Sequence, residues 1–175
     1  MKRIGFGQLE HNHLSSQRNG QIYAQLPAAS DLKVLENGMY VKYDYENGQV
    51  NLTGDGEWML VLNEVKLYDE TYRYYGPNNG MYAGYAMEAK NFMNGELVPR
   101  VFKTSVGDIY TTNCLVGKNA AGAELDMGEV AIGDELSPNA SGYLAKDGDG
   151  SMTWKVVKVY TMPDGQEGVK LQRVK

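Results

Sequence analysis

The fold is decided near the end of the sequence, by the stretch Met152-Thr153-Trp154-Lys155-Val156-Val157-Lys158-Val159-Tyr160. Its alternation over much of its length, with β-branched and aromatic residues throughout, predicts a β-strand. A turn follows at Met162-Pro163-Asp164-Gly165-Gln166, and alternation resumes in Gly168-Val169-Lys170-Leu171-Gln172-Arg173-Val174. Together these pieces predict a hairpin whose second strand turns Val169, Leu171 and Arg173 to one side and Lys170, Gln172 and Val174 to the other.

Turn signals of the same kind recur from Leu32 onward. Asn37-Gly38 and Asn47-Gly48 separate short runs that are rich in Tyr and Val. Asn-Gly between such runs is a strong hairpin signal, because a type I′ turn needs positive φ at both central residues. The apolar run Trp58-Met59-Leu60-Val61-Leu62 has the length of a strand. This part of the chain is therefore predicted to be a β-meander.

The second half continues the pattern of short strands and turns. A Gly-Asp pair before the start of an apolar strand occurs twice, at Gly107-Asp108 and Gly133-Asp134. Only Ala86–Met93 has the composition of a helix, of one or two turns. We predict a mainly β chain with one or two small barrel-like or sandwich-like units, hairpins and an extended N-terminal arm. The expected segments are an arm over 1–30, a β unit with a Tyr-rich loop over 31–96, and a second β unit over 97–175.

Residues 1–30 differ from the rest of the sequence because they are polar and rich in Gln, Asn, Ser and His. Their apolar residues are too sparse for a helix face, and such a segment cannot offset its ordering entropy alone. Two interpretations remain open: a floppy chain end, or an arm that orders against a neighbouring subunit. The predicted arm contacts are Ile4, Phe6, Leu9, Leu14, Ile22 and Tyr23.

A second candidate interface is the tyrosine-rich stretch between Glu70 and Gly95. Tyrosine combines a large apolar ring with a polar tip and is enriched at binding surfaces. The alternative is a loop packed on itself. The residues proposed for this interface are Tyr72, Tyr74, Tyr75, Tyr82 and Tyr85.

Composition excludes several classes of protein. The chain has 175 residues, 42% apolar and 22% charged, with a net charge of −5 that argues against a nucleic-acid-binding role. No apolar run approaches the roughly 20 residues of a membrane span, and the N-terminus does not resemble a signal peptide. One cysteine, Cys114, excludes an intramolecular disulfide. We expect synthesis in a cytoplasm.

A search for catalytic chemistry yields little. His11 and His13 form a His-x-His pair, but two ligands do not make a metal site, so we expect no metal and no cofactor. Cys114, in a strand-like context, is expected to be a buried side chain rather than a nucleophile. The run Asp147-Gly148-Asp149-Gly150-Ser151 begins like a calcium loop, but Met152 and Lys158 occupy the positions of its glycine and its closing Glu. A tight turn explains it better, and no enzymatic activity is expected.

The second half resembles head-associated structural proteins of tailed bacteriophages, namely capsid decoration (cement) proteins and head-fibre bases. The resemblance covers about residues 97–175, and less closely 32–68. It is carried by Pro99-Arg100-Val101, 106–113 (VGDIYTTN), 130–136 (VAIGDEL), Gly142-Tyr143-Leu144 and 154–166 (WKVVKVYTMPDGQ). It implies a β-rich virion protein on the capsid exterior that stabilises joints between major capsid subunits. An N-terminal arm that pairs with neighbouring capsid protein is also implied.

The expected partners are therefore the major capsid protein and other copies of the chain, with a head fibre or another virion protein as a further partner. Nucleic acid and membranes are not expected partners. One alternative is a carbohydrate-binding or receptor-binding module whose tyrosines stack on sugar rings. Another is a small β-fold enzyme with two facing carboxylates. A tail or baseplate component is close to the main hypothesis, and sequence does not separate the two.

Overall fold

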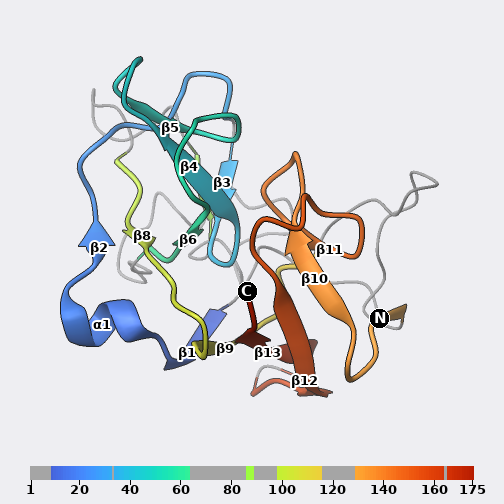
Figure 1. Ribbon diagram of the computed structural model, residues 1–175. Helices are drawn as coiled ribbons and strands as arrows, with labels where there is room; N and C mark the ends of the chain where they lie inside the picture. Colours follow the sequence, from blue (N-terminus) through green and yellow to red (C-terminus); the bar gives the residue numbers. More distant parts are fainter. Residues whose placement is uncertain (1–8, 33, 64–85, 89–97, 116–128, 164) are drawn as a thin grey trace.

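The prediction of a mainly β chain is confirmed by the computed structural model, which describes residues 9–32, 34–63, 86–88, 98–115, 129–163 and 165–175. Two antiparallel sheets, one of them curled like half a barrel, make up most of the described structure, and there is almost no helix. Figure 1 shows the two sheets lying against each other, with β4, β6 and β8 in one and β9, β12 and β13 in the other.

The larger sheet has six antiparallel strands. Their order is β1 (Leu9–His13), β9 (Ile109–Thr112), β13 (Glu167–Arg173), β12 (Trp154–Thr161), β10 (Glu135–Pro138) and β11 (Leu144–Ala145). Its centre is the predicted C-terminal hairpin, in which Trp154 pairs with Arg173 and Thr161 pairs with Glu167. Val169 and Leu171 are buried while Lys170 is only half-buried, so the predicted alternation is confirmed.

The smaller sheet has five strands. Their order is β2 (Ile22–Tyr23), β8 (Val101–Phe102), β6 (Met59–Val61), β4 (Tyr40–Asp44) and β5 (Gln49–Asn51). The predicted hairpin at Asn47-Gly48 is confirmed, since β4 pairs with β5 and Gly48 has a φ of 64°. Asn37-Gly38 is also a turn, but β3 (Val34–Glu36) pairs with β7 (Ala86–Glu88) in a separate two-stranded sheet instead of with β4.

The main core lies between the two sheets. Directly opposed residues of antiparallel strands point to the same face, and one such row runs across the smaller sheet through Ile22, Phe102, Leu60 and Tyr40. These side chains pack in one cluster with inward-facing residues of the larger sheet. The members contributed by that sheet include Tyr110, Leu136, Trp154, Val156, Val169 and Leu171.

A second cluster covers the opposite face of the smaller sheet. Val41, Val61 and Val101 point to this face, and each is fully buried. The cover comes from the chain that leads from β2 into β3. It includes Leu26, Ala28, Ala29, Leu32 and Leu35. Pro27 and Ala29 also bond through their backbones to Val50 of β5, so the segment after β2 closes over its own sheet.

The repeated Gly-Asp pair marks the same turn twice. Gly107 and Gly133 both have a φ of 95°, a conformation that favours glycine. The Asp that follows each Gly donates its backbone N–H to the carbonyl three residues earlier and accepts that residue's N–H on its carboxylate. Each turn leads directly into a strand, β9 or β10.

Three expectations need correction. Ala86–Glu88, the start of the predicted helix, is strand β7, whereas a short helix, α1 (Ser15–Asn19), lies in the segment judged unfit for one. Residues 9–30 are not an extended arm, because β1 and β2 are edge strands of the two sheets. The expected boundary at 96/97 also does not separate two units. The five-stranded sheet combines β2, β4 and β8, which come from all three expected segments.

Candidate functional surfaces

The predicted arm residues differ in where they lie and in how deeply they are buried. Leu14 is 2% exposed and belongs to the main core, so it is occupied within its own chain. Leu9 and Ile22 are partly buried against that core, and Tyr23 is partly buried against the second cluster. Ile4 and Phe6 lie outside the described residues. The interface prediction for these two residues therefore remains a prediction.

A buried carboxylate attaches the N-terminal segment to the larger sheet. Asp108 is 2% exposed, and its carboxylate accepts hydrogen bonds from the Ser15 backbone N–H and the Ser15 hydroxyl, both at 2.9 Å. It also accepts the Ser105 N–H at 2.9 Å. Three donors compensate the loss of water around a buried charge. Asp108 thus fixes the start of α1 beside the start of β9.

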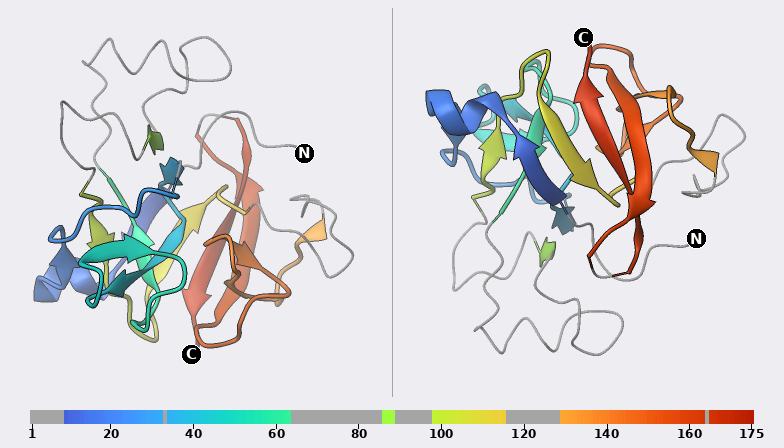
Figure 2. Two further views of the ribbon diagram at one scale, coloured as in Figure 1. Left: turned by 90° about the horizontal axis from the view of Figure 1, so that it is seen from above. Right: turned by 90° about the horizontal axis from the view of Figure 1, so that it is seen from below.

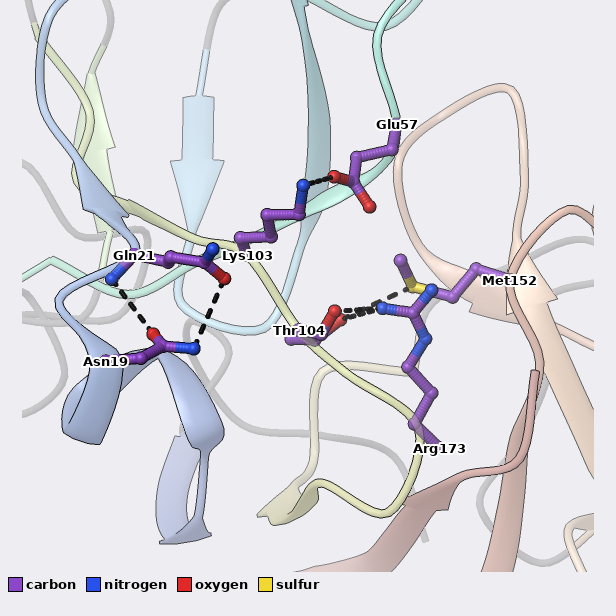
Figure 3. Close-up of polar contacts among 7 residues, drawn as sticks. All are labelled: Asn19, Gln21, Glu57, Lys103, Thr104, Met152 and Arg173. Carbon is purple, nitrogen blue, oxygen red and sulfur yellow. Dashed lines mark hydrogen bonds and ion pairs between the residues drawn. The ribbon is translucent and has the colours of Figure 1, made fainter.

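The segment after β8 joins the N-terminal segment to the last strand (Figure 3). Lys103 donates its backbone N–H to the Gln21 carbonyl, and its ammonium group lies 2.6 Å from the Glu57 carboxylate. The hydrogen bond and charge of Glu57 raise the pKa of Lys103. The next residue, Thr104, accepts from the Arg173 guanidinium on both its hydroxyl and carbonyl oxygens. The contacts of Thr104 with Arg173 thus join the segment after β8 of the smaller sheet to β13 of the larger sheet.

Aromatic side chains fill the centre of the core. The hydroxyl oxygens of Tyr40 and Tyr110 lie 2.9 Å apart, and both side chains are fully buried. The Tyr110 ring meets the Trp154 ring edge-on at a centroid distance of 4.8 Å, a favoured geometry for aromatic pairs. Burial raises the pKa of both phenols well above the ordinary value. These hydroxyls connect the two sheets, since each finds its partner across the core.

A different set of tyrosines from the predicted one gathers on the smaller sheet. The Tyr43 ring lies edge-on to Tyr23, at 6.1 Å, and to Tyr45, at 5.5 Å. Tyr45 is 74% exposed, whereas Tyr43 is buried. The predicted Tyr-rich interface, Tyr72, Tyr74, Tyr75, Tyr82 and Tyr85, lies outside the described residues.

The candidate catalytic and metal-binding residues are dispersed. His11 is exposed at the sheet edge, and the His13 ring contacts the Arg18 guanidinium at 3.0 Å. Cys114 is buried, with its sulfur 3.6 Å from a carboxylate oxygen of Glu36. Within the described ranges, no group of three or more His, Cys, Asp or Glu side chains is placed to hold a metal ion. No helix among those residues is long and apolar enough to span a membrane.

The run that begins like a calcium loop forms a turn whose central carboxylate has a structural role. Asp149 accepts the indole N–H of Trp58 at 2.6 Å on one oxygen, and the Ser151 N–H and hydroxyl on the other. Burial alone would raise the pKa of Asp149, but hydrogen bonds from Ser151 and Trp58 and the nearby charge of Lys42 hold it below the ordinary value. The Lys42 ammonium lies 4.6 Å from the centre of the Trp58 ring. The turn thus connects β10–β12 to the start of β6.

Several structurally important residues had no distinct signal in the sequence. Asp108 was visible only as part of a repeated Gly-Asp pair, and Thr104 and Ser15 belong to no motif. Comparison with known proteins finds no matching family model, no matching curated protein and no matching solved structure.

Proposed function

We propose that the chain is a non-enzymatic structural protein that binds the outside of a tailed-phage capsid and stabilises contacts between major capsid subunits. The structural role is supported by the hydrogen bonds of three charged side chains. Asp108 binds the N-terminal segment, and Asp149 and Arg173 form hydrogen bonds between segments of the two sheets. The capsid location rests on the strand-and-turn resemblance of residues 97–175.

The arm of this proposal is shorter than the sequence alone indicated. Residues 9–30 belong to the folded body, so Ile4 and Phe6, which lie outside the described residues, are the predicted arm contacts that we retain for capsid binding. Both residues precede β1, an edge strand of the six-stranded sheet. An edge strand offers backbone N–H and C=O groups to a neighbouring chain.

The test is co-sedimentation with shells assembled from the major capsid protein of the same phage. The full chain is compared with a chain that starts at Leu9 and with the Ile4→Ala/Phe6→Ala variant. The full chain is expected to sediment with shells at a fixed ratio, and both altered chains are expected to lose this while they remain folded. Light scattering on the free chain gives its oligomeric state. No association of the full chain with shells would refute the proposal.

A carbohydrate-binding or receptor-binding role is the second candidate. It is favoured by Tyr45, which is 74% exposed and whose ring lies edge-on to that of the buried Tyr43. An exposed aromatic ring is suited to stacking on a sugar. Glycan-array binding that is lost in Tyr45→Ala but retained in Tyr160→Ala would favour this role. Loss of binding in Tyr74→Ala or Tyr75→Ala would instead place the site on the predicted Tyr-rich stretch.

A further inference from the structure

Three lysines gather on the outer face of the C-terminal hairpin. Lys158 on β12 and Lys170 on β13 are directly opposed, and Lys155 lies on the same face, opposite Gln172. Alternation along the strands turns these side chains away from the core, into which Val156 and Leu171 point. Lys155 and Lys158 are exposed and Lys170 is half-buried. In the right-hand view of Figure 2, β13 and β12 lie in front, with no other described strand over them.

None of these ammonium groups forms an ion pair within the described part of the chain. The ion pairs found there join Lys103 to Glu57 and Lys146 to Asp134, and none involves the three lysines of the hairpin. Lys158 has one favourable contact, with the ring of Tyr160, whose centre is 5.2 Å away. Like charges directly opposed on neighbouring strands are destabilising. Among the described residues, the three lysines therefore form a positive patch that no ion pair neutralises.

The patch is conspicuous because the whole chain has a net charge of −5. Acidic residues lie at the margins of the face: Glu135 opposes Lys155, and Glu10 opposes Thr111, which in turn opposes Lys170. Three cations bounded by acids are too few to hold a long polyanion, and the net charge repels DNA at a distance. Val157, which is 37% exposed at the bulge in β12, adds apolar contact area. A surface with a few charges around an apolar area is suited to contact with another protein.

We propose that the outer face of β12 and β13, centred on Lys155, Lys158 and Lys170, docks on an acidic surface of a partner protein. The inference rests on the proposed function, because it specifies the chemistry of the surface that the protein would meet on its partner. Complementary charge would set the orientation and the rate of association. Binding through this face is therefore expected to weaken as salt is added.

The test uses the full chain and a fluorescent polyglutamate peptide as the probe, at low and at physiological salt. The Lys158→Gln/Lys170→Gln variant is compared with Lys103→Gln/Lys146→Gln, which changes the net charge equally at two lysines outside this face. We expect the hairpin variant to weaken peptide binding at least about fivefold, the loss appropriate to two exposed charge contacts. The control is expected to change binding less than twofold. Since the hairpin variant relieves a like-charge pair, its unfolding midpoint should stay equal or rise.

Other outcomes would overturn the proposal. Equal weakening in the control would mean that only net charge matters, and undetectable peptide binding at low salt would mean that the face does not attract acidic proteins. Tighter binding of a duplex DNA of equal charge would point to nucleic acid instead. Shell co-sedimentation separates this inference from the proposed function. Unchanged sedimentation of Lys158→Gln/Lys170→Gln refutes the lysine face alone, whereas failure of the unaltered chain to sediment refutes the capsid role.

Discussion

Removal of the N-terminal segment should unfold the protein instead of releasing a detachable arm. A chain that starts at Ser30 lacks β1, α1 and β2, together with Leu14 and Ala29, which are buried in the two clusters. A chain that starts at Leu9 keeps every contact described above. The two truncations therefore distinguish a folded segment from an arm.

The magnitude follows from three losses. Removal of the side chain of a buried leucine such as Leu14 lowers the free energy of unfolding by about 2–5 kcal/mol. Asp108 loses both hydrogen bonds from Ser15, at roughly 1.5–3 kcal/mol for each bond to a charged group. The loss of the cover over Val50 adds to this. Even the lowest sum, about 5 kcal/mol, matches the smallest stability typical of a folded domain.

The assay is urea unfolding followed by tryptophan fluorescence, because Trp58 and Trp154 both belong to the main core. The full chain is expected to unfold cooperatively, and so is the chain that starts at Leu9, because it keeps every contact described above. The chain that starts at Ser30 is expected to show no cooperative transition. Leu14→Ala in the full chain should lower the free energy of unfolding by about 2–5 kcal/mol. A folded, cooperatively unfolding chain from Ser30 would refute the reasoning and restore the detachable arm.

Three further predictions concern single residues. Gly142→Ala should lower the free energy of unfolding, measured in urea, by at least about 2 kcal/mol. Residue 142 has a φ of 78°, and a Cβ there would lie 2.5 Å from a backbone oxygen of β4. Gly150→Ala should lower it less, because residue 150 also has a positive φ but has open space around the added Cβ. Burial raises the pKa of Tyr110, so the stability it confers is complete below about pH 10 and is lost as pH rises further. Its phenolate absorbance, measured as the difference from Tyr110→Phe, should therefore appear only with unfolding. The pKa of Asp149 is lowered, so the stability that its carboxylate confers is present above about pH 4 and is lost as the pH falls below that. The change in Trp58 fluorescence over that pH range should be absent in Asp149→Asn.

The parts of the fold that sequence predicted are those with local signals. The hairpin of β12 and β13 has an alternating pattern on both strands and a glycine, Gly165, with a φ of 85° in its turn. The β4–β5 hairpin has Asn47-Gly48, where the Asp44 carboxylate also accepts the Asn47 N–H. In both cases a few neighbouring residues determine the geometry. Their patterns are therefore readable without knowledge of the remaining chain.

The sequence did not predict that the N-terminal segment is folded, because none of its elements places more than two apolar residues in a cluster. Edge strand β2 has two residues, of which Ile22 packs against the main core and Tyr23 against the second cluster. Leu14, which precedes α1, packs in the main core. Such sparse apolar residues give no periodicity within their own segment. Their burial depends on Phe102 and Val101, about eighty residues away, with which β2 pairs.

Polar groups likewise depend on partners that lie far away in the sequence. Ser15 and Asp108 are 93 positions apart, and Trp58 and Asp149 are 91 apart, yet each pair forms a hydrogen bond at the junction of separate elements. A buried carboxylate needs several donors, and none of these donors is identifiable until the two sheets are brought together. Asp149, which lies in the run that begins like a calcium loop, thus joins separate elements of the fold, as Asp108 does. The lysines of β12 and β13 differ from these residues, because no ion pair among the described residues involves them and Lys158 contacts the ring of Tyr160 instead.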